Sequence, residues 1–277
     1  MRFKFYKAML KILFAALCTF LMVPGVQAKE KYKGTFIYIP LDDRPVTYSY
    51  PVKNLQAAGY EILTPPEKYL ASADRNGDPD RLWQWLVENA PDADAAVISS
   101  DALIYGGLVA SRTHFFDETT LQARVQRLEM LRERLPMPLY VYSTLMRTPR
   151  ASFGNVEPPY YSKIGPAIFR YSELLDKEDT TGLTLRESLA KQAIKNNLPQ
   201  ADLNDWLQRR LKNYHVNKSL TELTAKYRFH YLAIGKDDNA PLSATHMEAR
   251  YIKRDAFALS DQIFQIIPVL TSLACCF

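Results

Sequence analysis

The chain has 277 residues, and its 35 Lys and Arg against 30 Asp and Glu give a formal net charge of +5. Four of the basic residues lie in the first 11 positions, so the rest of the chain has a formal charge of only +1. Nucleic-acid binding needs a concentrated basic face, and we therefore expect no nucleic-acid partner. The three cysteines, Cys18, Cys275 and Cys276, lack the spacing of a disulfide framework or a Cys-ligated zinc site.

Residues 1–28 have the pattern of a secretory signal peptide. A basic start is followed by the apolar run Ile12–Val23, which is shorter than the ~20 residues of a membrane span. A Pro-Gly pair ends the run, and Val26 and Ala28 are the small residues of a cleavage site. We predict cleavage after Ala28 and an exported protein with no stable membrane span after cleavage. The less favoured alternatives are an uncleaved membrane anchor and a lipoprotein.

Short apolar runs alternate with helical patterns in the rest of the chain. The periodicity predicts strands at 35–41, 61–63, 95–100, 138–143 and 229–234. It predicts helices at 51–59, 78–86, 117–135, 167–175, 184–196 and 202–227. Near-continuous apolar strands that alternate with helices are typical of a Rossmann-like α/β fold, in which flanking helices cover both faces of a mostly parallel sheet.

We predict one α/β domain over residues 29–252, with a helical insertion at about 164–228. Residues 253–277 are an atypical tail, because their apolar run has no turn chemistry that links it to another strand–helix unit. A frame-shifted or truncated end and an ordinary terminal helix explain this tail equally well.

Polar clusters follow four of the predicted strands. In parallel α/β folds, ligands bind beyond the carboxyl ends of the strands, so we expect these clusters to share one edge of the sheet. They comprise Asp42, Asp43, Arg44, Asp101, Arg147, Asp237, Asp238 and Asn239.

Carboxylates at this edge are the candidate catalytic groups. Asp42, Asp43, Asp237 and Asp238 would serve in acid–base chemistry or hold a divalent metal. Adjacent carboxylates repel, so a cation or a shared proton would help to hold Asp237 beside Asp238. His246 is a candidate base or ligand. Turn formation and helix capping are equally good explanations for Asp43 and Asp101, and an ordinary structural role is the alternative for His246.

Other residues near the same strand ends are candidate substrate-binding groups. The guanidinium groups of Arg44, Arg112 and Arg147 suit an anionic or polyhydroxylated substrate, although pairing with the chain's own aspartates explains them as well. Asp101, Tyr105 and Asn239 complete the set. The glycines after Tyr105 would let a ligand approach the backbone near Asp101. No phosphate-binding loop, dinucleotide fingerprint or nucleophile elbow is present.

Six segments resemble, in order, the signature blocks of the bacterial family DUF4127. They are IPLDDRPVTYSYPV, ISSDALIYGGLVASR, YSTLMRTPRAS, IFRYSELLDK, NYHVNKSLTEL and IGKDDNAPLSATHMEAR. The resemblance spans about Phe36 to Arg250, implies one conserved unit and gives weight to the candidate residues inside these blocks. It implies no reaction. Family members are typically longer, so the loss of the pattern near Lys253 implies a chain truncated after about residue 251.

These patterns together predict a hydrolase-type enzyme that acts on carbohydrate or cell-envelope material. Two alternatives stay open: a non-catalytic extracytoplasmic protein that binds a carbohydrate or another small molecule, and a truncated inactive fragment. The cofactor is open as well, with a divalent metal as the candidate.

Overall fold

The computed structural model describes residues 32–134, 137–151 and 155–268. The predicted signal peptide lies outside the described residues, as does the last part of the predicted tail. The described residues from Gly34 onward belong to one compact unit. Of the helices in the described part, none is both long enough and apolar enough to cross a membrane.

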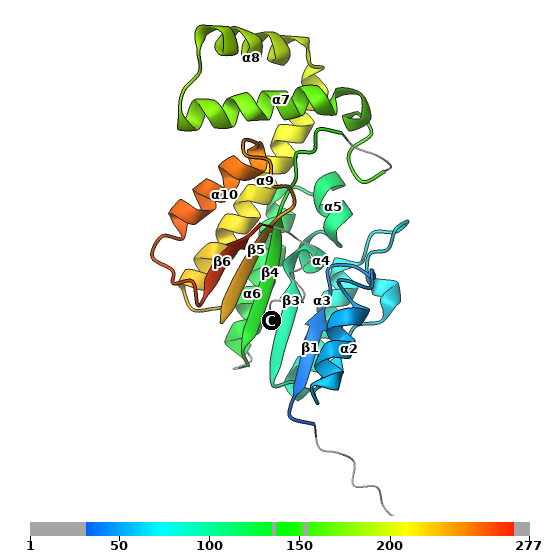
Figure 1. Cartoon of the computed structure of the whole chain (residues 1–277). Coiled ribbons are helices and arrows are strands. Elements are labelled where there is room, and N and C mark those ends of the chain that lie inside the picture. The colour runs from blue at the N-terminus through cyan, green and yellow to red at the C-terminus, as the bar shows by residue number, and fades with distance from the viewer. Residues whose placement is uncertain (1–31, 135–136, 152–154, 269–277) are drawn as a thin grey trace, which may run out of the picture. The chain divides into compact units, whose positions relative to one another are not determined.

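A six-stranded, all-parallel sheet forms the centre of the fold, with the order β2-β1-β3-β4-β5-β6 (Figure 1). Its strands are β1 (Thr35–Ile39), β2 (Glu61–Leu63), β3 (Ala95–Ser99), β4 (Leu139–Leu145), β5 (Tyr231–Lys236) and β6 (Phe264–Ile267). The predicted α/β fold with a parallel sheet and flanking helices is confirmed. Strand β2 lies on one side of β1, whereas β3 and all later strands lie on the other side. The direction of strand addition therefore reverses between β1 and β3, and the carboxyl ends of these two strands form a topological switch point. Ligands bind at such points in open α/β sheets.

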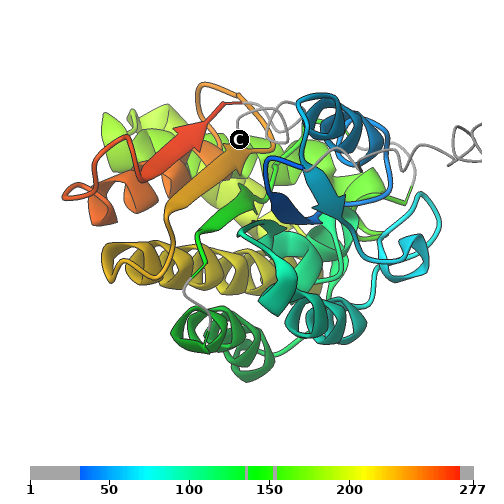
Figure 2. The same ribbon diagram turned by 90° about the horizontal axis from the view of Figure 1, so that it is seen from below.

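Helices lie on both faces of the sheet, with α6 and α9 on one face and α2 on the other (Figure 2). The α-helices are α2 (Ser49–Ala57), α3 (Pro79–Asn89), α4 (Ser100–Ile104), α5 (Leu108–Thr113), α6 (Glu118–Arg134), α7 (Tyr161–Thr180), α8 (Leu185–Asn197), α9 (Gln200–Ala225) and α10 (Ala244–Asp255). Alternate residues of each strand point to opposite faces. Ile37 therefore packs in the main core with Leu128 of α6 and Leu220 of α9, while Tyr38 packs in a smaller cluster against Val52 of α2.

The predicted helical insertion consists of α7, α8 and α9. Figure 1 shows α7 and α8 beyond the carboxyl ends of the strands, and α9 runs from there along the sheet. A separate small core joins Tyr161 and Ile168 of α7 to Trp206 of α9 and Ala244 of α10. Helix α7 is thereby fixed against the start of α10, next to the loop that follows β5.

Strand β6 was not predicted from the sequence pattern, and it lies within the segment expected to be a tail. Phe264 and Ile266 pair in parallel with Leu232 and Ile234 of β5, and Phe264 enters the main core. A strand of only four residues is too short to show a clear period-2 pattern in the sequence. Its pairing with β5 in the structure is what identifies it.

Gly106 gives a test of the turn that joins α4 to α5. It has a φ of +94°, and a Cβ there would lie 2.5 Å from the carbonyl oxygen of Gly77. We expect Gly106→Ala to lower the free energy of unfolding by about 2–4 kcal/mol, because backbone strain and a clash with backbone atoms add together. Gly182→Ala is the matched control, since its φ is +79° but a Cβ there would meet nothing within 4 Å. The control should lose about 1 kcal/mol in denaturant unfolding, and equal losses would contradict the close approach.

Candidate functional site

The four predicted polar clusters follow β1, β3, β4 and β5, which are consecutive neighbours in the sheet. All four strands are parallel, so their carboxyl ends lie at one edge. The sheet therefore places the clusters side by side, as the sequence predicted. The contacts among the side chains decide what each residue does there.

An ion pair between Arg112 and Asp237 lies at this edge. Arg112 belongs to α5, Asp237 follows β5 directly, and Nη2 of Arg112 donates to Oδ2 of Asp237. Both side chains are at least nine-tenths buried. Burial raises the pKa of Asp237, while the charges of Arg112 and Arg147 lower it. Each charge needs the other, because a buried charge without a partner is very costly.

Glu157, which the sequence analysis missed, joins this pair to Arg147. Its Oε1 lies 3.6 Å from Nη1 of Arg112 and accepts a hydrogen bond of 2.6 Å from Nε of Arg147. Burial raises the pKa of Glu157, although the positive charge of Arg112 acts to lower it. Glu157 lies in the long connection between β4 and α7, where no periodic pattern marks a buried residue, so only its contacts identify it.

Asp101 lies in the first turn of α4 and is 1% exposed. It does not cap the helix, because the cap is the Ser99 side chain, which accepts from the Ala102 N–H. Oδ1 of Asp101 accepts from Thr144 at 3.1 Å, and Oδ2 has no hydrogen-bond partner among the described residues. Burial raises the pKa of Asp101 to about 7, with the charge of Asp237 acting in the same direction and Thr144 and Arg112 opposing both.

We call Asp101, Arg112, Arg147, Glu157 and Asp237 the rim network. It contains three carboxyl groups and only two guanidinium groups, so ionisation of every member would leave one negative charge without a partner. One proton in the network restores the balance, and carboxyl groups that share a site commonly hold one in this way. Asp101 is the member best placed to hold it, because it makes no ion pair.

Several buried polar atoms of the rim network and of the nearby Tyr105 and His114 have no partner in the part of the chain that the structure describes. They are Asp101 Oδ2, Tyr105 Oη, Arg112 Nε, His114 Nδ1 and Glu157 Oε2. The ring centroids of Tyr105 and His114 lie 5.0 Å apart. Burial lowers the pKa of His114 to about 4. Each unsatisfied buried group costs about 1–3 kcal/mol, and a catalytic role is one of the reasons why a native structure keeps such a group.

Asp42 and Arg44 form a separate bidentate pair after β1. Nε of Arg44 donates to Oδ1 of Asp42 at 3.0 Å, and Nη2 donates to Oδ2 at 2.7 Å. The bond to Asp42 is the main cause that raises the pKa of Arg44, and the charges of Asp237 and Asp43 add to it. Arg44 is half-exposed, so it lies at the solvent-facing side of the rim network. Asp43 is half-buried, and its backbone N–H donates to the Ala71 carbonyl.

Asp238 has a structural role despite being next to Asp237. Its Oδ2 accepts from the Thr148 N–H at 2.7 Å and from Thr245 at 2.6 Å, and its Oδ1 accepts from Ser243 at 3.2 Å. The two adjacent carboxylates avoid repulsion because they turn to different partners. Asn239, the next residue, is exposed.

His246 lies on α10, and the side chain that it contacts belongs to none of the predicted site residues. Its Nδ1 is 2.7 Å from Oδ2 of Asp176 on α7, a residue that the sequence analysis did not single out. The predicted site residues thus separate into the rim network, the Asp42–Arg44 pair, the Asp238 loop and the His246 pair.

The described residues bring no three His, Cys, Asp or Glu side chains together in a group that could hold a metal ion. Asp42 and Asp237 are each neutralised by an arginine, and Asp238 is already surrounded by donors. Three of the four carboxylates that the sequence offered as ligands of a divalent metal, Asp42, Asp237 and Asp238, are therefore already held by other partners.

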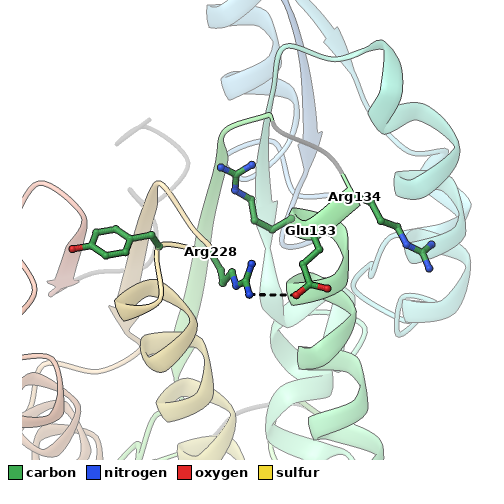
Figure 3. A pocket seen from close by; sticks show the side chains of 5 residues that line it. Glu133, Arg134 and Arg228 are labelled. Carbon is green, nitrogen blue, oxygen red and sulfur yellow. Dashed lines mark ion pairs between the residues drawn. The ribbon is translucent and has the colours of Figure 1, made fainter.

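A hollow of about 450 Å³ lies at the opposite end of the sheet, where α6 and α9 end (Figure 3). Its lining residues are Arg132, Glu133, Arg134, Tyr227 and Arg228. Arg228 is paired with Glu133 at 3.3 Å. The lining residues come just before β4 and β5 in the chain, at the amino ends of these strands. The hollow is therefore remote from the carboxyl ends, where the rim network lies.

The fold and the site define an α/β protein with a buried carboxyl–guanidinium network at the carboxyl ends of an all-parallel sheet. A family model described as "Protein of unknown function (DUF4127)" matches residues 36–268, and the chain belongs to this family. The match continues past residue 251, where the sequence pattern predicted truncation, and it includes β6. A search of the curated proteins gives no match.

The raised pKa of Asp101 predicts how stability depends on pH. Between about pH 4 and pH 7 the folded chain holds a proton on Asp101 that the unfolded chain has released. The free energy of unfolding should therefore fall as the pH rises, by about 1.4 kcal/mol per pH unit for each such proton. Glu248, whose burial also raises its pKa to about 7, adds to the same trend.

Asp101→Asn keeps an acceptor for Thr144 and removes the titrating group. We expect denaturant unfolding of this variant to show a shallower fall in stability between pH 4 and pH 7 than the unmodified chain. A fall of unchanged slope would show that Asp101 does not hold the proton.

Proposed function

We propose that the chain is an exported hydrolase-type enzyme that acts on carbohydrate or other cell-envelope material at the rim network. The observation that carries this proposal is the buried Asp101 carboxyl, with an unpaired oxygen, in a network that has one carboxyl group more than it has guanidinium groups. General acid–base catalysis requires a group that exchanges a proton near the working pH. Two carboxyl groups in different environments supply the acid and the base.

The two carboxyl groups have different surroundings. Asp237 is held by Arg112 and is one-tenth exposed, so it is the carboxylate that a substrate reaches first. Asp101 lies behind it and stores the proton. Arg44 and Asn239 are the more exposed groups of this edge, and they suit the hydroxyl or anionic groups of a substrate.

Non-catalytic binding of a carbohydrate or another small molecule is the second candidate function. The observation that favours it is the pairing of Arg44, Arg112 and Arg147 with carboxylates of the same edge. Such a pre-formed arrangement suits a rigid ligand site, because little reordering is needed on binding.

A substrate screen separates the two functions. The chain from Lys29 onward would be incubated with neutral and acidic oligosaccharides and with peptidoglycan fragments, and the products analysed by mass spectrometry. We expect hydrolysis of at least one substrate and a loss of about 10²–10⁴-fold in rate for Asp101→Asn and Asp237→Asn. The control Glu133→Gln changes a carboxylate paired with Arg228 at the opposite end of the sheet and should retain the rate. Calorimetric binding without any hydrolysis would favour the binding protein instead.

Export is tested by the mass of the mature N-terminus. When the full chain is expressed in a bacterium, we expect the extracytoplasmic fraction to contain a protein that begins at Lys29, because the cleavage pattern ends at Ala28. A product that retains residues 1–28 and stays in the cytoplasm would contradict export.

A further inference from the structure

A second titratable pair lies outside the rim network, between α7 and α10. Nδ1 of His246 is 2.7 Å from Oδ2 of Asp176. Asp176 has no exposed surface, whereas 32% of the His246 side chain is exposed. Among the described residues, Nε2 of His246 has no hydrogen-bond partner, and it is not one of the buried unpaired atoms. A buried carboxylate therefore holds one ring nitrogen while the other reaches solvent.

Asp176 is fixed in place by two further donors. Arg250 donates to its Oδ1 at 2.6 Å, and the backbone N–H of Ser243 donates to its Oδ2 at 3.0 Å. Each oxygen of the Asp176 carboxylate accepts a hydrogen bond and carries no proton to donate. Oδ2 therefore accepts from the imidazole. This arrangement selects the tautomer with hydrogen on Nδ1 and leaves the lone pair on Nε2, because the partner of one ring nitrogen decides the state of the other.

The pair is attached to the loop that carries Asp237. Ser243 donates through Oγ to Asp238 and accepts at the same atom from the His246 N–H. The loop after β5 and the first turn of α10 thus hold Asp176 and His246 at the carboxyl end of the sheet, where α7 also lies (Figure 1).

The chain contains an internal comparison in His215 and Glu118, whose Nδ1 and Oε1 lie 2.5 Å apart. His215 is 35% exposed, close to the value for His246, but Glu118 is 51% exposed. Exposed pairs contribute little, because water competes for both partners. The burial of the carboxylate therefore distinguishes the His246 pair from a surface ion pair.

We propose that Asp176 and His246 form a proton-accepting dyad that activates a hydroxyl group or a water molecule for the proposed hydrolysis. In this step the O–H bond breaks, an Nε2–H bond forms, and the charge gained by the imidazole is stabilised by Asp176. His246 is the catalytic residue, and Asp176 is a positioning residue that acts through it. The dyad rests on the proposed function, to which it adds a proton acceptor besides the carboxyl groups of the rim network. The sequence named His246 as a candidate base, and its contact with Asp176 gives that role a buried partner.

The tautomer of His246 gives a test that needs no substrate. In ¹⁵N-labelled protein, at a pH where the ring is neutral, we expect NMR to show hydrogen on Nδ1 of His246 and loss of this preference in Asp176→Asn. Modification by diethyl pyrocarbonate should be faster at His246 than at His215, although their exposures match. A wild-type His246 with hydrogen on Nε2, or equal modification rates at the two histidines, would overturn the dyad even if Asp176→Asn fails to fold.

Kinetics on a substrate from the oligosaccharide screen separate this inference from the proposed function. We expect His246→Gln to lower kcat by about 10²–10⁴-fold with little change in KM, while Glu118→Gln and His215→Asn keep the wild-type kcat. Full activity of His246→Gln alongside an inactive Asp101→Asn would overturn the dyad and leave the proposed function standing. Absence of any hydrolysis would overturn the proposed function. The tautomer of His246 and its modification rate would then show by themselves whether Nε2 is a proton acceptor.

Discussion

The ion pair between Arg112 and Asp237 is the interaction on which the carboxyl edge of the sheet depends. It ties α5 to the end of β5 in surroundings where neither charge is stable alone. Glu157 extends the pair to Arg147, and so joins two residues that lie between β4 and α7. The third carboxyl group, Asp101, makes no ion pair among the described residues. Burial raises the pKa of Asp101 to about 7, and the excess of carboxyl groups over guanidinium groups in the network favours its protonated form as well.

The strand order brings these groups together. Residues from α5 and the β5 loop are 125 positions apart in the chain, yet they make a direct contact because β1, β3, β4 and β5 are consecutive in a parallel sheet. The turn at Gly106 lets α4 end and α5 begin within a few residues, which places Asp101 and Arg112 on the same side. A left-handed backbone and a close approach to Gly77 both require glycine at this position.

The aspartates of this edge look alike in the sequence but have different surroundings. Asp238 accepts bonds from Thr148, Thr245 and Ser243 and fixes a loop, whereas Asp237 faces Arg112 and Asp101 is buried with an unpaired oxygen. His246 shows the same dependence on surroundings, because its partner is a buried aspartate of α7 rather than a carboxylate of the strand ends. The environment of each carboxyl group decides whether it supports the fold or exchanges protons.

The sequence by itself determined the fold class, the family resemblance and the edge where the polar groups lie. Hydrophobic periodicity is a local property, and alternating strands and helices predict a parallel sheet with ligand groups at its carboxyl ends. The sequence did not determine β6, Glu157 or Asp176. The first is a four-residue strand recognised by its pairing with β5, and the other two lie in segments where no pattern marks a buried acid. Which carboxylate meets which cation was decided only by the tertiary structure, since ion pairing and desolvation depend on atoms that are distant along the chain.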